Sequence, residues 1–481
     1  MRQRYQLLPD PRRKQQTTGD NLMTTQTATS QPQNMRAFMT VWLGELVSMI
    51  GSSLTVFGLG VFMFQKTGQA TPFALTMFFF QLPTILLAPL GGIVADRYNR
   101  RLVMLAADAL SAVGSLAAVW LVATNGLEVW HVYGLAVTYA ISNAFQEPAY
   151  MASITMMVPK AQLGRANGMM QMGQALTSLI GPLLAGALYA PLGLTGLITI
   201  DFATFFIAIG ALALVRIPRP EAATAETKAK KSFWQEAMFG WRYIGARAGL
   251  LGLLIYFAII NFLANLAFVL IGPLVLSFTT PDVYGILQAV GGFAMLAGSI
   301  VMSAWGGPKR RMLAVYGFIA LATPGLILIG LQPAPVMIGA GFVVLMFFIP
   351  LGSGASSALW QTKTDPAAQG RVFSVRIMIS RALMPLAMLI AGPLADFVFE
   401  PFMRGSSPLA TQIGAVIGSG AGRGVGLIFV LAGTLSLLAT LAAFLNPRIR
   451  NLEDELPDFA PVTAPDETGE ALTQTATAGA K

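Results

Sequence analysis

The chain has no cysteine and only one histidine, His131, among its 481 residues. Without cysteine, neither disulfide bonds nor thiolate metal sites can form. A single histidine also argues against haem-carrying membrane oxidoreductases, which use histidines as axial ligands. No loop of the type G-x-x-x-x-G-K marks a site for ATP, and no nucleophile, base or metal ligands cluster in the sequence. We therefore predict neither an enzyme nor a bound metal or cofactor.

Charged residues are scarce as well, at 11% of the chain, whereas 55% of residues are hydrophobic and the mean hydropathy is +0.64. A bilayer's hydrocarbon core of about 30 Å needs roughly 20 apolar residues per helix. Twelve runs of this kind can be counted, six before residue 216 and six after residue 247. The composition predicts an all-α membrane protein with twelve transmembrane helices in two six-helix halves.

The polar stretches divide the chain into five parts. Residues 217–247 are rich in charge, and Trp234, Met238, Trp241 and Ile244 recur there at helical spacing, which predicts an interfacial amphipathic helix; a plain soluble linker helix is the alternative. The expected parts are a disordered cytoplasmic tail (1–35), an N-terminal half (36–216), the linker (217–247), a C-terminal half (248–447) and a second disordered cytoplasmic tail (448–481).

The net charge of +9 does not indicate a nucleic-acid partner, because of where the charges lie. All but five of the 31 Lys and Arg fall in tails and loops on one predicted side. The exceptions are Lys66, Arg404 and Arg423 in loops expected outside, and Arg376 and Arg381 within a helix. This asymmetry predicts that both termini are cytoplasmic and that the basic loops contact anionic lipid head groups.

One turn between two apolar runs carries an ordered set of charges. A small residue is followed four positions later by an acid, and bases follow the acid at one, four and five positions; these residues are Gly92, Asp96, Arg97, Arg100 and Arg101. The simpler interpretation is an ordinary cytoplasmic turn. The order, however, resembles the signature G-x-x-x-D-R-x-G-R-R of the major facilitator superfamily. Asn99 replaces the usual glycine, and asparagine is the next most tolerant residue of a left-handed backbone.

The two halves also align with each other at a single offset of 206 residues. Gly164-Arg165 falls on Gly370-Arg371, and Ala185-Gly186 on Ala391-Gly392. The same offset places Gly92 on Gly298 but Asp96 on Met302, so the acid occurs once. Such a parallel repeat predicts pseudo-symmetric halves around a central cavity, as in the facilitator fold.

A second signature lies in the fifth run, where Gly181, Pro182 and Gly186 permit a bend and close helix packing. It resembles the G-P-x-x-G motif of the drug:proton antiporters, with Ala185 in place of the second glycine. Further segments resemble the branch of macrolide-efflux and enterobactin-exporter-like proteins; they include Glu147-Pro148-Ala149, Leu163-Gly164-Arg165-Ala166-Asn167-Gly168 and Gly370-Arg371-Val372-Phe373. The resemblance covers about residues 36–447 and implies a proton-driven exporter of the bacterial inner membrane.

Ionisable side chains within a bilayer cost about 2.5–3.5 kcal/mol each at a helix centre, so each needs a reason. Glu45 lies in the first run and Glu147 in the fourth, and the resemblance implies that both helices line the cavity. Burial favours the protonated form of a carboxyl group, as a proton carrier requires. We interpret both residues as proton-coupling or substrate-binding groups, with a hydrogen-bonded structural acid as the alternative.

Other ionisable groups in the apolar runs receive separate interpretations. Asp201 is a further candidate, although a structural role is favoured for it, and Arg381 requires an acid, a carbonyl cluster or an anionic substrate. Asp108 is expected to pair with the hairpin arginines, and Asp396 to be solvated at the outer surface. The facilitator resemblance implies that Asp96 lies near Arg376 and a helix N-terminus, as a latch for the state closed on the cytoplasmic side.

The sequence thus predicts a transporter that exports a small amphiphilic molecule, drug-, macrolide- or siderophore-like, in exchange for protons. We expect it to act as a monomer. The alternatives are uptake or facilitated diffusion of a metabolite on the same fold, a lipid-modifying enzyme whose site is made of single residues, and a non-transporting sensor or assembly partner.

Overall fold

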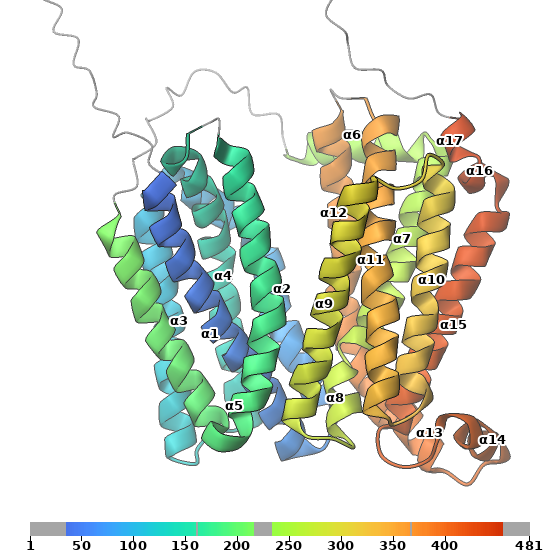
Figure 1. The fold of residues 1–481 in the computed structure, drawn as a ribbon, viewed down its shortest axis with the longest axis horizontal. Coiled ribbons are helices and arrows are strands. Elements are labelled where there is room, and N and C mark those ends of the chain that lie inside the picture. Colours follow the sequence, from blue (N-terminus) through green and yellow to red (C-terminus); the bar gives the residue numbers. More distant parts are fainter. Residues whose placement is uncertain (1–34, 160–161, 216–232, 366–367, 456–481) are drawn as a thin grey trace, which may run out of the picture.

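The computed structural model describes residues 35–159, 162–215, 233–365 and 368–455, which form two helical bundles side by side (Figure 1). The first bundle comprises α1 (Met35–Thr67), α2 (Ala70–Arg97), α3 (Arg100–Ala123), α4 (Val129–Met157) and α5 (Leu163–Leu214). The second comprises α7 (Ala248–Phe268), α8 (Ile271–Leu276), α9 (Pro281–Trp305), α10 (Arg311–Leu331), α11 (Pro335–Lys363), α12 (Gln369–Leu394) and α15 (Arg423–Leu445).

Ten of the described helices are long and apolar enough to cross a membrane. One of them, α5, consists of two spans joined at Gly193, whose φ of 63° breaks the helix and suits glycine alone. The helix α4 has the length of a span but carries the polar side chains of Asn143, Gln146 and Glu147. With α5 counted as two and α4 included, the structure contains the twelve spans that the sequence predicts.

The turn between α2 and α3 differs in its backbone from the expectation. Asn99 has φ −64° and ψ 111°, which is extended rather than left-handed. Its side-chain oxygen accepts a hydrogen bond from the N–H of Arg101 at 3.1 Å and so caps the N-terminus of α3. Asparagine replaces glycine here as a helix cap, and the tolerance of a left-handed backbone plays no part.

The segment before the last span was expected to be a loop, yet it is mostly helical. A π-helical turn (Ala395–Phe399) follows α12, and α13 (Glu400–Arg404) and α14 (Pro408–Ile417) come after it. Arg423, expected in this outer loop, is fully buried at the start of α15, where its guanidinium donates to the carbonyl oxygen of Ile417 at 3.1 Å. One carbonyl group at the end of α14 and one in α10, that of Gly330 at 3.5 Å, thus supply acceptors for a cation that has left solvent.

The helix α6 (Phe233–Gly245) occupies the segment where the sequence predicts an amphipathic helix. Ile244 is buried, whereas Met238 and Trp241 are exposed. Gly240 lies against the backbone of Arg371, which brings α6 to the beginning of α12. Contact of α6 with a membrane surface stays a prediction.

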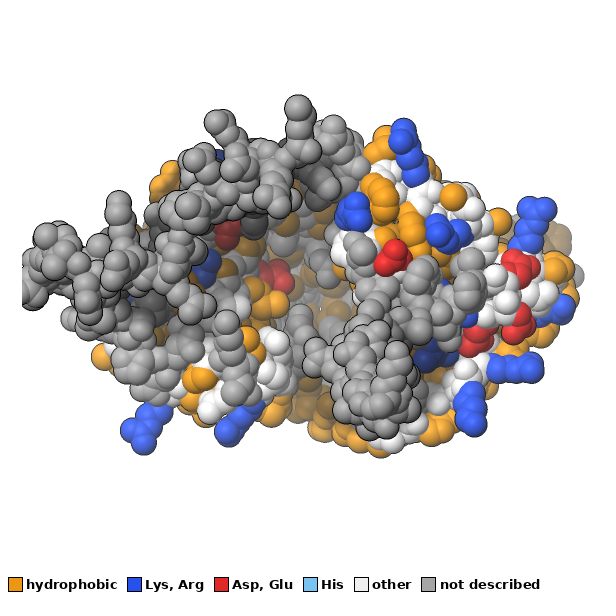
Figure 2. Space-filling model, turned by 90° about the horizontal axis from the view of Figure 1, so that it is seen from above, with side chains coloured by type: hydrophobic (Ala, Val, Ile, Leu, Met, Phe, Trp, Pro, Cys, Tyr) orange, Lys and Arg blue, Asp and Glu red, His pale blue; other side chains and the backbone are white. Residues whose placement is uncertain are grey.

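The two ends of the molecule differ in how the halves meet. We call the end that carries the α2–α3 turn the Asp96 face, and the end that carries the π-helical turn the Asp396 face; they are the upper and lower ends in Figure 1. Contacts between the halves are made mainly by α5 with α9 and by α2 with α12. Figure 2, which looks onto the Asp96 face, shows the molecule hollowed between the two halves.

The close contacts lie near the Asp396 face. The carbonyl oxygen of Pro182 in α5 contacts Gly285 of α9, and Gly392 of α12 contacts Thr71 of α2. A Cβ at Gly392 would lie 2.5 Å from the Cα of Thr71, so only glycine permits this approach. The structure is therefore closed at the Asp396 face and open at the Asp96 face.

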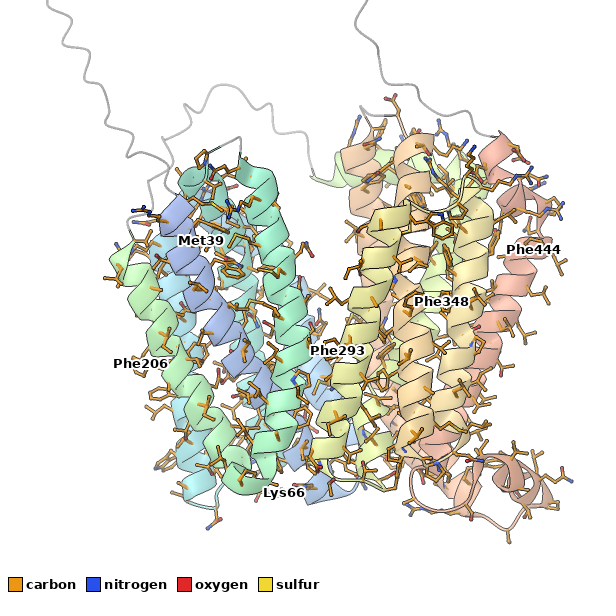
Figure 3. All side chains as sticks on the ribbon, in the orientation of Figure 1. Met39, Lys66, Phe206, Phe293, Phe348 and Phe444 are labelled. Atoms are coloured by element: carbon orange, nitrogen blue, oxygen red, sulfur yellow. The ribbon has the colours of Figure 1, made fainter. Side chains whose placement is uncertain are left out.

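The outer flanks carry many exposed apolar side chains. Phe206 of the first half and Phe444 of the second point away from the bundles in Figure 3, and Phe206 is 58% exposed. Exposed apolar surface of this extent is typical of helices in contact with lipid. The inner faces of the bundles instead carry small residues that allow close packing.

The repeat between the two halves is visible in one pair of glycine contacts, but its register differs by one residue from the alignment at an offset of 206. Gly298 packs against the carbonyl oxygen of Phe347 in α11, and Gly91 packs in the same way against Ala144 of α4. Gly92 has no atom within 4 Å of its added Cβ position. The structural counterpart of Gly298 is thus Gly91 rather than Gly92, and Asp96 has no acidic counterpart in either register.

Candidate functional site: a cavity between the two halves

A cavity of about 710 Å³ lies between the halves, on the Asp96 side of the contacts that close the Asp396 face. Side chains of α1, α2, α4 and α5 line it from one half and side chains of α7, α8, α9 and α12 from the other. Eight of its twenty lining residues are aromatic or methionine, and Phe57, Phe80, Phe268, Met77 and Met388 are among them. Flexible methionine and flat aromatic side chains adapt to varied apolar ligands.

Glu147 of α4 is the only carboxylate among the described residues that line this cavity. It is exposed to the cavity, and the polar side chains of Gln81, Asn143, Asn265 and Gln288 also line the wall. A negative charge within an aromatic wall matches a ligand that has a cationic group and an apolar body.

The floor of the cavity is formed by an aromatic pair that joins the two halves. Phe57 of α1 and Tyr284 of α9 stack with ring centroids 5.0 Å apart and an interplanar angle of 21°. Beside them, Pro182 and Gly186 of the helix-five motif contact α9 of the other half. A Cβ at Gly186 would lie 2.7 Å from the carbonyl oxygen of Pro281, and Gly181 packs against Ser53 of α1. Pro182 and Gly186 therefore contribute to closing the Asp396 face, whereas Gly181 packs within the first half.

Asp396 is not solvated as expected but bridges the two halves. Its carboxylate accepts hydrogen bonds from the N–H groups of Ala70 at 2.9 Å and Thr71 at 2.7 Å, at the N-terminus of α2. Gln69, which precedes α2, provides no side-chain cap of its own. The first N–H groups of α2 are thus satisfied by the other half. The sequence does carry a signal for this residue, because Gly392 and Asp396 repeat the spacing of Gly92 and Asp96.

The hairpin residues at the Asp96 face make contacts within their own half. Asp96 lies 4.0 Å from the guanidinium of Arg100, and its side chain is 79% exposed. Arg100 also donates to the carbonyl oxygen of Ala152 at 2.7 Å, and Arg101 donates to that of Ala213 at the same distance. Arg97 is exposed. Two of the three arginines thus attach the start of α3 to the ends of α4 and α5.

The expected meeting of Asp96 with Arg376 is not present in this conformation. Arg376 donates to the hydroxyl of Ser356 at 3.2 Å and lies over the ring of Trp360 at 5.4 Å, both within the second half. The guanidinium is therefore held by α11 rather than exposed near the surface. The backbone of Arg381 lies in α12, but its side chain is outside what the structure describes.

Glu45 and Asp108 form a buried group with a residue that the sequence did not single out. The side-chain amide of Gln146 donates to Glu45 at 3.0 Å and to Asp108 at 2.6 Å. Glu45 is 6% exposed and Asp108 is fully buried. The expected pairing of Asp108 with hairpin arginines is wrong, because Asp108 faces inward on α3 toward α4. Gln146 could have been noticed as a polar neighbour of Glu147 in an otherwise apolar span.

Glu45 and Glu147 do not face one another. Glu45 lies inside the first half, whereas Glu147, one position after Gln146 on α4, turns into the cavity.

Asp201 has a different environment, made of hydroxyl groups. It accepts hydrogen bonds from Thr55 at 2.7 Å, Tyr139 at 2.8 Å, Ser52 at 3.1 Å and Ser115 at 3.3 Å. These donors come from α1, α3 and α4, so one carboxylate connects three helices to the second span of α5. Such hydrogen bonds offset part of the cost of burying a carboxyl group.

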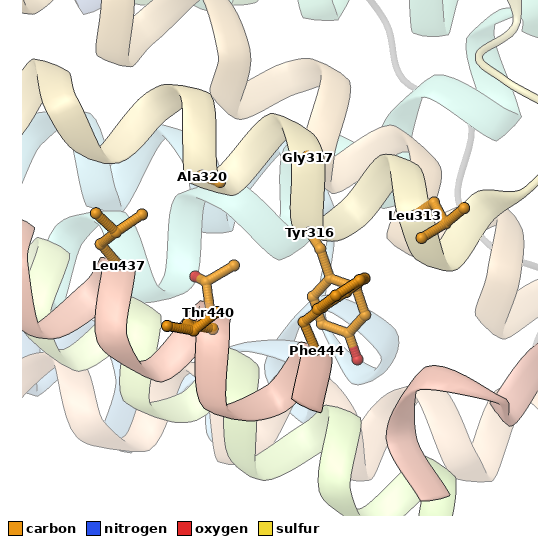
Figure 4. A pocket seen from close by; sticks show the side chains of 8 residues that line it. Leu313, Tyr316, Gly317, Ala320, Leu437, Thr440 and Phe444 are labelled. Carbon is orange, nitrogen blue, oxygen red and sulfur yellow. The ribbon is translucent and has the colours of Figure 1, made fainter. Parts of the chain in front are cut away.

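A second cavity of about 280 Å³ lies between α10 and α15, within the second half (Figure 4). Leu313, Leu437 and Phe444 are among the residues that line it, and no charged side chain does so among those described. Its polar side chains, Tyr316 and Thr440, are hydrogen-bonded to the carbonyl oxygen of Ala443 at 3.4 Å and to the hydroxyl of Tyr256 at 3.0 Å, and the cavity does not lie between the halves. The cavity that contains Glu147 is the candidate site.

Comparison with known families decides what kind of protein carries this site. The model of the Major Facilitator Superfamily matches residues 41–388, well over half of the chain. The chain belongs to the Major Facilitator Superfamily. Members of this superfamily are transporters, so this facilitator is a multi-pass membrane transporter and not an enzyme, which excludes the lipid-modifying alternative.

Curated relatives of this facilitator carry the names of efflux proteins. It is 27% identical over 369 residues to macrolide efflux protein A of Streptococcus pyogenes, covering 75% of this chain and 89% of that protein. It is 26% identical over 378 residues to the multidrug efflux pump Tap of Mycobacterium tuberculosis, covering 74% and 86%. These relatives confirm the resemblance to the drug-efflux type of facilitator.

Solved structures support the fold. A bacterial homologue of the human lysosomal transporter Spinster, in an inward-facing and unoccupied conformation, matches with a TM-score of 0.65 at 15% identity, over 90% of this chain and 99% of that one. The nucleoside transporter NupG matches with a TM-score of 0.59 at 14% identity, over 86% of this chain and 100% of that one. At these identities the likeness concerns the facilitator fold alone.

Proposed function

We propose that this transporter exports cationic amphiphilic small molecules across the bacterial inner membrane in exchange for protons. The observation that carries the proposal is the cavity between the halves, in which Glu147 is set in a wall of aromatic and methionine side chains. The names of the efflux relatives support the direction of transport, and the aromatic wall supports a substrate with an apolar body.

The orientation of the transporter in the membrane follows from where its positive charges lie. The α2–α3 turn, with Arg97, Arg100 and Arg101, lies at the Asp96 face, and the positive-inside tendency favours the cytoplasm for this face. The cavity then opens to the cytoplasm in this conformation, as an exporter requires for loading. Both chain termini are expected on the same side.

We infer that Asp96 and Asp396 stabilise opposite conformations. The helices α2 and α12 run antiparallel, and near the end of each an acid follows a glycine by four residues, Asp96 within α2 and Asp396 in the π-helical turn after α12. Asp396 caps the N-terminus of α2 while the Asp396 face is closed. When the halves rock so that the Asp96 face closes, Asp96 is placed to do the same at the N-terminus of α12, with Arg376 near. When one of the two carboxylates binds a helix N-terminus, the other would be released, and water would take its place at the helix N-terminus that it leaves.

The energetics of proton exchange are adequate for export. Moving one charge through ~150 mV supplies about 3.5 kcal/mol, and this free energy holds a substrate gradient of roughly 300-fold. Glu45 and Glu147 are the candidates for coupling, Glu147 because it faces the substrate cavity and Glu45 because it is buried close behind that cavity. Asp201, with four hydroxyl donors, and Arg381 are candidates of lower rank.

The test uses inverted membrane vesicles with the full chain and a radiolabelled macrolide as the probe. We expect uptake into these vesicles when a proton gradient is imposed, and loss of uptake after an uncoupler is added. Vesicles that contain the Glu147→Gln variant test whether this transport depends on the cavity. Transport that ignores the proton gradient would refute coupling, and movement only in the opposite direction would establish uptake instead of export.

A further inference from the structure

We propose that Asp108 and Gln146 complete a proton-binding site with Glu45, in which two carboxyl groups hold one proton between them. This inference rests on the proposed proton-coupled transport and names the group that carries the proton. It assigns to Asp108 a role in the transport cycle and to Gln146 the role of a positioning residue.

The geometry places three helices around one amide. Glu45 comes from α1, Asp108 from α3 and Gln146 from α4, and the amide nitrogen of Gln146 is the common donor, at 3.0 and 2.6 Å. An amide has two N–H bonds, so one is directed to each carboxyl group. The other oxygen of each acid, Oε1 of Glu45 and Oδ2 of Asp108, is buried with no hydrogen-bond partner.

Two unpartnered buried oxygens on neighbouring acids are the positions where a proton binds. With both acids ionised, two negative charges would share a single neutral donor inside a bundle of low dielectric, which costs more than keeping one of them protonated. Protonating one acid removes the repulsion and gives its free oxygen an O–H group. Proton binding here converts one carboxylate into a carboxylic acid and breaks no other bond.

Asp201 is a buried acid of the same half that has more hydrogen-bond donors. It receives four hydroxyl donors, while Glu45 and Asp108 receive two N–H bonds between them. The difference between the two environments singles out the Glu45–Asp108 pair and makes Asp201 the matched control.

Tyr150, one turn beyond Gln146 on α4, interacts electrostatically with Glu45, and its buried hydroxyl has no hydrogen-bond partner. Asp108 is the charged group that α3 directs at Glu45. From α5, the helix packed most extensively on α1, small side chains meet the glycines of α1 on either side of Glu45, with Ala211 near Gly44 and Thr204 near Gly51.

The pair is connected to the substrate cavity through α4. Gln146 holds the acids and the next residue, Glu147, lines the cavity. Pro148 follows, and because proline has no N–H, the carbonyl oxygen of Ala144 lacks its helical donor and lies against Gly91 of α2. A cation that binds Glu147 thus acts on a helix segment whose hydrogen bonding is already interrupted, and a shift of this segment would move the donor shared by the two acids.

The test is pH-difference infrared spectroscopy of the full chain in lipid vesicles, which detects the C=O stretch of a protonated carboxyl group without any substrate. We expect a band in the wild type that is lost in the double variant Glu45→Gln, Asp108→Asn and altered in each single variant. The band should persist in Asp201→Asn. A band that is the same in Asp108→Asn as in the wild type would overturn the inference.

If Asp108→Asn folds poorly, Gln146→Met provides a second test, because it keeps the volume of the side chain and removes the donor. We expect the band to shift in this variant, since the carbonyl loses a hydrogen bond; an unshifted band contradicts the inference. Macrolide transport measured on the same preparations separates the two claims. If transport follows the proton gradient but the band is absent, the proposed function stands and the proton site is refuted. If the band is present but transport does not follow the gradient, the proton site stands and the proposed function is refuted.

Discussion

Replacing Asp396 with alanine removes the acceptor that holds the first N–H groups of α2 in the closed Asp396 face. Two hydrogen bonds from Ala70 and Thr71 are lost, and Gln69 offers no substitute cap. In the opposite conformation these N–H groups face water, so the substitution should destabilise the closed Asp396 face and leave the alternative almost unaffected.

The size of the effect can be bounded from helix caps. Removing a side-chain cap costs about 0.5–2 kcal/mol, and the charge of Asp396 places this contact in the upper part of that range. A change of one or two kcal/mol alters an equilibrium by a factor of about 5 to 30. We therefore expect the population with an open Asp396 face to rise by about that factor relative to the closed one.

The measurement is a distance between spin labels attached to cysteines at Asn125 and Leu409, both exposed at the Asp396 face, one in each half. The natural chain contains no cysteine, so no background labelling has to be removed. In Asp396→Ala the long-distance population should increase, and in Asp396→Asn, which keeps one acceptor oxygen, it should increase less.

The matched control is Ser407→Ala. Ser407 caps α14 at the same face by accepting from the N–H of Ala410 at 3.2 Å, entirely within the second half. Its loss should leave the distance distribution unchanged. If Asp396→Ala also matches the wild type, the contact with α2 does not contribute to closure and the reciprocal roles proposed for Asp96 and Asp396 are wrong.

Three further predictions concern the cavity and the two faces. In equilibrium binding, Glu147→Gln should weaken the affinity for a cationic amphiphile by about 10- to 150-fold, which corresponds to the loss of a charged hydrogen bond of about 1.5–3 kcal/mol. The affinity for a neutral analogue should not change, and equal losses for both ligands would contradict the role of Glu147. Gly186→Val should prevent closure of the Asp396 face and abolish transport, because its side chain meets the backbone of α9, whereas Gly134→Ala, with no atom within 4 Å, should transport normally. Asp96→Asn should increase the population open at the Asp96 face, measured as faster labelling of cavity cysteines from that side; equal labelling rates would count against the latch.

The fold could be predicted from the sequence because the membrane leaves few alternatives. Backbone groups in hydrocarbon must be hydrogen-bonded within the chain, so each long apolar run becomes a helix. The run lengths and the charges in the turns then set the number of spans and the expected sidedness. The glycines of the helix-five motif could also be recognised, since only small residues permit the contact that Gly186 makes with α9.

Partnerships between side chains required the tertiary structure. Nothing in the spacing of Glu45, Asp108 and Gln146 indicates that one amide joins them, because they lie on three helices whose rotation about their axes is set by packing. For the same reason the sequence assigned Asp108 to the arginines and left Asp396 in solvent. Apolar periodicity is weak in helices that face lipid on one side and protein on the other, so the inward face of each span is decided by close contacts of small residues.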